Sequence, residues 1–103
     1  MAELPEPRRF SGLLRDEILG FRVPVATSRR SRLLGLALLD RERAGEGLLI
    51  PRCRSVHTFG MRFALDLIFL DARGTVVEIR RQVPPRRLVR CPRADSVLEL
   101  PSP

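Results

Sequence analysis

The residue types best suited to chemistry lie together in one segment, Ser55 to Asp71. This segment holds the only histidine of the chain, one of its two methionines and three of its five phenylalanines. It also places an acid, Asp66, inside an apolar stretch that has the pattern of a strand. An isolated buried carboxylate is very costly, so Asp66 must be hydrated, protonated or paired. His57 and Arg62 are nearby candidates for pairing, and we expect the functional site here.

The apolar stretch is best explained as a strand over Arg62 to Leu70. Side chains alternate between the two faces of a strand. One face would carry Arg62, Ala64, Asp66, Ile68 and Leu70, and the other Phe63, Leu65, Leu67 and Phe69. Both faces are largely apolar, which predicts a central strand. Four residues of strand span roughly 13 Å, so an arginine from another strand is an equal candidate to pair with Asp66: Arg52, Arg54, Arg86 or Arg87.

Each of these residues also has a structural interpretation. Asp66 could accept hydrogen bonds from backbone N–H groups of a neighbouring loop, as buried acids usually accept them. A lone histidine is more often a hydrogen-bonded structural residue than a base, although with Asp66 it could form an orienting pair for proton transfer. Met61 could form a soft apolar surface with Phe59, or pack in the core.

We expect a small binding domain whose polar cleft takes a small anionic or polar ligand. The predicted ligand-binding residues are His57, Thr58, Met61, Arg62 and Asp66. Arg62 would hold the anion, Asp66 would orient Arg62 or His57, and Met61 with Phe59 would form an apolar wall. Two alternatives remain open: a basic interaction module that docks an acidic protein or nucleic acid, and a hydrolase-like enzyme that uses His57 and Asp66. No complete catalytic set with a nucleophile is legible, so no catalytic residue is assigned.

The net charge bears on the hypothesis of a basic interaction module. All 19 basic residues are arginine, against 12 acids, for a net charge of +7. Such a balance favours an anionic partner, but the arginines are spread along the whole chain. Phenylalanine is the only aromatic residue, which leaves a thin stacking platform for single strands.

The two cysteines, Cys53 and Cys91, are too few for two paired zinc-ligand clusters. We therefore expect no metal and no cofactor; the spacing leaves a disulfide between them open. Residues Met1 to Arg15 lack the apolar core of a secretory signal, and no stretch approaches the roughly 20 apolar residues that span a bilayer. A cytoplasmic protein without a membrane partner is the default expectation, and the oligomeric state stays open.

A chain of 103 residues is long enough for one domain. We expect residues 1–20 to form a loosely ordered arm that could add a short strand, and residues 21–103 to form the β domain. A helix is predicted over about Arg29 to Leu38, capped by Thr27 or Ser28, with Leu33, Leu36 and Ala37 on one face. Turns are expected at Ala44–Gly47 and Asp71–Gly74, and further strands at Phe21–Ala26, Gly47–Ile50, Thr75–Ile79 and Ser96–Leu100. The fold class is mainly β (α+β if the helix is counted), a small barrel or sandwich with one short helix.

Several of these segments together resemble the DUF192 family, a widespread domain of unknown function. The resemblance extends from about Phe21 to Leu100, and its parts are Arg32–Leu36, Gly47–Ile50, Ser55–Phe63, Leu65–Asp71 and Val97–Leu100. Where the family often has proline, this chain has Ala64. The resemblance implies a compact, mainly β domain with a short helix and no established activity. It also directs attention to His57, Met61, Arg62 and Asp66.

Overall fold

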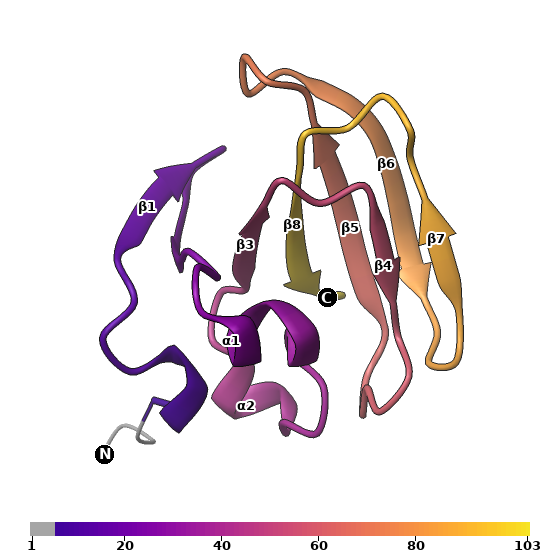
Figure 1. Ribbon diagram of the computed structural model, residues 1–103. Coiled ribbons are helices and arrows are strands. Elements are labelled where there is room, and N and C mark those ends of the chain that lie inside the picture. Colours follow the sequence, from indigo (N-terminus) through magenta and orange to yellow (C-terminus); the bar gives the residue numbers. More distant parts are fainter. Residues whose placement is uncertain (1–5) are drawn as a thin grey trace.

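The computed structural model describes residues 6–103 (Figure 1). Part of the expected N-terminal arm, residues 1–5, lies outside this range. In chain order the elements are η1 (Arg8–Phe10), β1 (Arg15–Ile18), β2 (Phe21–Pro24), α1 (Arg29–Leu34), α2 (Arg41–Ala44), β3 (Leu48–Pro51), β4 (Ser55–His57), β5 (Leu65–Leu70), β6 (Val76–Val83), β7 (Leu88–Arg90) and β8 (Ser96–Pro101).

The centre of the fold is a four-stranded antiparallel sheet in the order β3–β8–β5–β6. Two smaller antiparallel pairs, β1–β2 and β4–β7, accompany it. The strands of residues 6–103 do not close into a barrel, as Figure 1 shows. The prediction of a mainly β fold is confirmed, and so is the hairpin turn at Asp71, where the Asp71 N–H donates to the Thr75 carbonyl over 2.9 Å.

The four-stranded sheet is covered on both faces, so β5 is a central strand, as its two apolar faces predicted. On one face, Leu65, Leu67 and Phe69 are fully buried in a core shared with the segment after α1 and with β4. On the other face, Ile68 and Leu70 pack with side chains of β2 and β8. We call these the helix face and the hairpin face. Each fully buried apolar side chain contributes about 1.5–3 kcal/mol.

The helical region differs from the prediction. Ser28 caps α1 as expected, because its hydroxyl accepts the Ser31 N–H over 3.1 Å. However, α1 ends before Gly35, whose backbone conformation (φ +53°, ψ −127°) only glycine adopts without strain. The helix therefore does not reach Leu38, and Leu33 is 67% exposed instead of buried beside Leu36 and Ala37.

A second short helix, α2, forms where the sequence suggested only a turn from Ala44 onward. Asp40 precedes it in an extended conformation and Gly45 ends it with a φ of +62°. The fold thus has two short α-helices among residues 6–103 rather than one. A further strand that the sequence did not predict, β7, lies in the proline-containing segment after β6, where it pairs with β4.

The N-terminal segment packs against this frame. β1, the strand that residues 1–20 could have added, is present and pairs with β2. Phe10 of η1 is buried in the helix-face core. The Arg9 guanidinium donates to the carbonyl of Ala37, which holds η1 against the segment after α1.

Candidate functional site

Asp66 lies opposite a β-bulge. Leu65 pairs with Val83 and Leu67 with Arg80, so β6 has two residues, Arg81 and Gln82, where β5 has only Asp66. The extra residue gives Gln82 a φ of +52° and takes its N–H out of the regular ladder. Asp66 Oδ1 accepts this N–H over 2.9 Å.

The hydroxyl of Ser102 provides the second partner of Asp66. Its Oγ donates to the same Oδ1 over 2.6 Å, and Ser102 itself is buried. The Arg81 guanidinium lies 4.0 Å from Oδ2 at the exposed side. Asp66 therefore ties the bulge of β6 to the chain after β8, and its bond from a backbone N–H is the kind that the structural interpretation expected.

A groove of about 540 Å³ opens on the hairpin face beside Asp66. Its apolar lining comes from β2, β5, β6 and β8, through Phe21, Ile68, Ile79 and Leu100. Charged side chains at the groove are Arg41, Glu46, Asp66 and Arg81. This volume falls within the roughly 300–1,000 Å³ of small-molecule sites, which are mostly apolar with a few placed polar groups.

The two arginines are the groups of this groove that can hold an anion. Glu46 is engaged, because its Oε2 accepts the Arg22 N–H over 2.7 Å. Neither Arg41 nor Arg81 donates a hydrogen bond to another side chain or backbone group of residues 6–103; the nearest charged contact of Arg81 is the 4.0 Å approach to Asp66. A guanidinium is always ionised and binds carboxylates in a bidentate manner.

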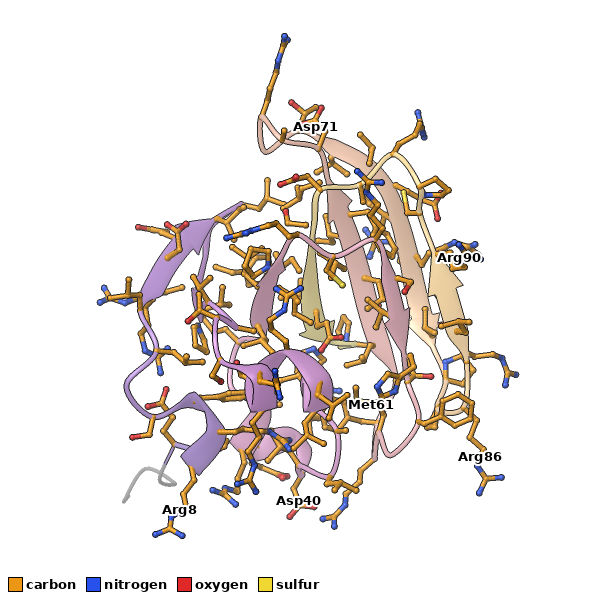
Figure 2. The ribbon with its side chains drawn as sticks, viewed as in Figure 1. Arg8, Asp40, Met61, Asp71, Arg86 and Arg90 are labelled. Carbon is orange, nitrogen blue, oxygen red and sulfur yellow. The ribbon has the colours of Figure 1, made fainter. Side chains whose placement is uncertain are left out.

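The other predicted site residues lie elsewhere. His57 Nε2 lies 3.2 Å from the Leu33 carbonyl oxygen, and its ring lies 6.2 Å from that of Phe59. Arg62 falls in the loop before β5, not on the strand, and pairs with Asp40 over 2.9 Å. Met61 is buried in the helix-face core, at the end of the molecule opposite Asp71 (Figure 2).

Thr58 has a clear structural task. Its Oγ1 donates to the Pro84 carbonyl over 2.7 Å and accepts the Arg87 N–H over 2.8 Å. These bonds fix the loop between β6 and β7 against the end of β4. His57, Thr58, Met61 and Arg62 thus lie at the end of β4 and in the loop before β5, whereas Asp66 lies on β5 and points to the hairpin face of the sheet. No hydrogen bond joins His57 to Asp66, so the proposed orienting pair is not formed.

Sequence reasoning missed Glu99, the most unusual acid of the structure. Glu99 lies on β8 and points to the helix face, where its residue surface is only 2% exposed. Burial raises its pKa to about 7; the Leu36 N–H, which donates to the carboxyl group, and the charge of Arg9 oppose this only in part. Oε1 is buried without a hydrogen-bond partner among residues 6–103.

A sequence signal for Glu99 was present. It stands between Leu98 and Leu100 in an apolar strand, as Asp66 does between Leu65 and Leu67. Glu99 is therefore an acid in an apolar strand in the same way as Asp66. A strongly perturbed pKa in a recess is a recognised mark of functional groups.

Cys53 and Cys91 are both free thiols. Cys53 Sγ donates to the Ser55 carbonyl over 3.1 Å, and burial raises the pKa of its thiol. No three His, Cys, Asp or Glu side chains within residues 6–103 are grouped closely enough to hold a metal ion. In the same range, no helix has the length and apolar character that a membrane crossing requires.

The fold defines a class: a small, mainly β domain with an antiparallel central sheet and an open groove on one face. The chain belongs to the DUF192 family, whose description is "Uncharacterized ACR" and whose pattern matches residues 13–102. Its function is therefore uncharacterised at the family level.

The chain is also similar to a protein of unknown function from Novosphingobium aromaticivorans, known from a crystal structure. The TM-score is 0.65 and the sequence identity 22%, over 80% of this chain and 64% of that one. At this identity the likeness concerns the fold alone, and the chain spans less than two thirds of its relative's length. Among curated proteins, none matches.

Proposed function

We propose that this protein binds a small organic anion with an apolar body in the groove on the hairpin face. The observation that carries the proposal is the groove of about 540 Å³, with an apolar lining and two arginines not hydrogen-bonded to the described chain. The apolar body would lie on Ile68, Ile79 and Leu100, and the anionic group would reach Arg81 and Arg41. The class of ligand is the one predicted from the sequence, but the anion is assigned to Arg41 and Arg81 instead of Arg62.

Octanoate is a suitable probe because it combines an eight-carbon chain with one carboxylate. We expect octanoate to shift the methyl NMR signals of Ile68, Ile79 and Leu100. Arg81→Gln should weaken its binding about tenfold, because a charge-assisted hydrogen bond contributes about 1.5–3 kcal/mol.

The matched control is Arg73→Gln, which removes one positive charge from the distant β5–β6 turn. It should leave the affinity unchanged apart from a small general charge effect. Equal affinities of Arg81→Gln and Arg73→Gln, or methyl shifts confined to the helix-face core, would refute the proposal.

The alternative role as a basic docking module rests on a different surface. Leu33, Leu38, Phe59 and Leu88 are exposed apolar side chains. Three of these positions adjoin His57: the Leu33 carbonyl is its hydrogen-bond partner, Phe59 is its ring neighbour, and Leu88 is its cross-strand partner. Arg8 lies far from Arg86 and Arg90, which both point outward on the β7 side (Figure 2), so the arginines are divided between two edges and the apolar patch favours an acidic protein over nucleic acid.

Binding of a duplex DNA oligonucleotide and of an acidic peptide built from Glu and Leu would distinguish these partners. For a protein-docking surface, Phe59→Ser should abolish peptide binding, and the weak DNA binding should vanish between 50 and 200 mM salt. DNA binding that survives this salt step would exclude the protein-docking role. A cytoplasmic location, which the two free thiols suit, stays a prediction.

A further inference from the structure

A second, much smaller cavity of about 40 Å³ lies on the helix face of the sheet. Glu99, His57, Cys53 and Gly35 line it, and the exposed residues Arg32, Leu33 and Ser55 stand at its solvent side. A water molecule occupies about 30 Å³ in the liquid. The cavity therefore has room for water and is far smaller than the roughly 300–1,000 Å³ of small-molecule sites.

Glu99 contributes an unsatisfied acceptor to this cavity. Its carboxyl group receives the Leu36 N–H, but Oε1 has no partner among residues 6–103. Oε1 faces the space left by the absent side chain of Gly35, because a Cβ placed on Gly35 would lie 2.6 Å from it. A buried oxygen that lacks a hydrogen bond costs about 1–3 kcal/mol, more if it is charged.

His57 contributes a second unsatisfied atom. The carbonyl of Leu33 can only accept, so the Nε2 atom that lies 3.2 Å from it must carry the hydrogen. In the neutral ring this leaves Nδ1 as an acceptor. Nδ1 is buried and has no partner among the described residues.

Three other charged or titratable groups lie around Glu99. Arg32, on α1, donates to the carbonyls of Pro51 and Arg52. Arg9, on η1, donates through Nη2 to the Ala37 carbonyl, whereas its Nε is buried without a partner among residues 6–103 and its charge acts to lower the pKa of Glu99. Cys53, after β3, donates to the Ser55 carbonyl. None of these donors is hydrogen-bonded to Oε1.

We propose that Glu99 and His57 form an acid–base centre around one bound water molecule. The water donates one hydrogen to His57 Nδ1. When Glu99 is protonated, its hydroxyl donates to the water; when Glu99 is ionised, the water donates its other hydrogen to Oε1. A proton can then pass from the Glu99 carboxyl to the water while the water passes one of its own to Nδ1. The products are a carboxylate, an unchanged water and an imidazolium, so atoms and charge balance.

This centre is distinct from the groove on the hairpin face. Its ligand class is a water-sized hydrogen-bond donor, whereas the groove takes an organic anion. Arg32 and Leu33 flank the solvent side, so a molecule that exchanges a proton with the centre would approach between α1 and Ser55. The raised pKa of Glu99, about 7, makes proton uptake by the carboxyl accessible near neutral pH.

NMR of the single histidine tests the centre directly. At pH 8 we expect the His57 tautomer with hydrogen on Nε2, and a long-lived water in contact with the ring proton Hε1. Across pH 5–9 the Hε1 signal should report the protonation of Glu99. Glu99→Gln should remove that pH response, while Asp66→Asn, on the opposite face, should keep it.

Hydrogen on Nδ1 at pH 8, absence of the bound water, or the same pH response of the Hε1 signal in wild type and Glu99→Gln would overturn the proposal. His57→Phe provides an independent measurement if Glu99→Gln fails to fold. The phenyl ring fills the water position and removes Nδ1, so the carboxyl ¹³C signal of Glu99 should titrate above the wild-type midpoint. An unchanged midpoint would equally reject the centre.

Discussion

Asp66 and Glu99 are two acids on neighbouring central strands, yet the tertiary structure treats them in opposite ways. Asp66 pairs across the sheet with Leu100 and Glu99 with Leu67, so their side chains point to opposite faces. Asp66 receives a backbone N–H and a hydroxyl on one oxygen. Glu99 is more deeply buried and keeps one oxygen without a partner among residues 6–103.

The comparison shows that burial by itself does not define the role of an acid. A carboxylate that closes a bulge stabilises the fold and has a complete structural explanation. A carboxyl group with a raised pKa and an unsatisfied oxygen lowers stability at neutral pH, and such groups persist where they serve another role. Two acids in similar apolar strands thus differ in role: Asp66 stabilises the bulge, and Glu99 is the candidate functional group.

Gly35→Ala is expected to cause the largest loss of stability. The conformation of Gly35 (φ +53°, ψ −127°) suits glycine alone, and the new Cβ would lie 2.6 Å from Glu99 Oε1. We expect a loss of about 3 kcal/mol or more, of which the backbone accounts for about 1–3. Thermal unfolding followed by circular dichroism measures it.

Gly45→Ala is the matched control for that substitution. Gly45 has nearly the same backbone conformation (φ +62°, ψ −140°), but no atom lies within 4 Å of a Cβ placed on it. The difference between the two variants therefore isolates the contact with Glu99. Equal losses would show that Glu99 moves aside without cost.

Asp66→Ala should have the next largest effect. It leaves the Gln82 N–H and the Ser102 hydroxyl without an acceptor, and a buried unsatisfied group costs about 1–3 kcal/mol. We expect a loss of about 2–3 kcal/mol in urea unfolding, and less than about 1 kcal/mol for Asp66→Asn, which keeps an acceptor oxygen. If both variants lose the same amount, the negative charge rather than the acceptor holds the bulge.

Glu99→Gln should have a smaller effect of the opposite sign, which depends on pH. The folded protein holds a proton on Glu99 up to a pKa of about 7, above the ordinary value of 4.5. The wild type therefore loses stability as pH rises from about 4.5 to 7, by roughly 3 kcal/mol at 1.36 kcal/mol per pKa unit. Above pH 7 this contribution is constant.

Glu99→Gln carries no charge at this position, so it does not lose stability over this pH range. Its free energy of unfolding at pH 8 should exceed that of the wild type by up to about 3 kcal/mol, and the two should converge near pH 4.5. Urea unfolding at several pH values gives the comparison. Parallel wild-type and variant curves would mean that folding does not raise the pKa of Glu99.

Arg62→Gln is expected to have the smallest effect. The Arg62–Asp40 pair is short, at 2.9 Å, but both side chains are more than half exposed. Such surface pairs contribute about 0.2–1 kcal/mol and weaken with salt. Urea unfolding in low and high salt should show a loss at the lower end of that range, and octanoate affinity should not change. A marked loss of affinity would return the anion site to Arg62.

The local sequence determined several elements of the fold. Alternation along Leu65–Leu70 predicted a central strand with Asp66 and Ile68 on one face, because side-chain direction in a strand follows position alone. Asp71–Gly74 predicted the hairpin, and Ser28 the helix cap, because these depend on bonds between near neighbours. The motif resemblance further indicated the family.

Contacts between distant segments were decided only by the tertiary structure. The bulge at Gln82 depends on the register between β5 and β6, so the partners of Asp66 could not be inferred from its neighbours. Similarly, spacing placed His57 near Asp66, but the sheet separates their side chains. Glu99 became distinctive only when the segment after α1 packed over it and shielded it from water. Desolvation and hydrogen-bond satisfaction are properties of the packed surroundings, which the sequence of a single strand does not contain.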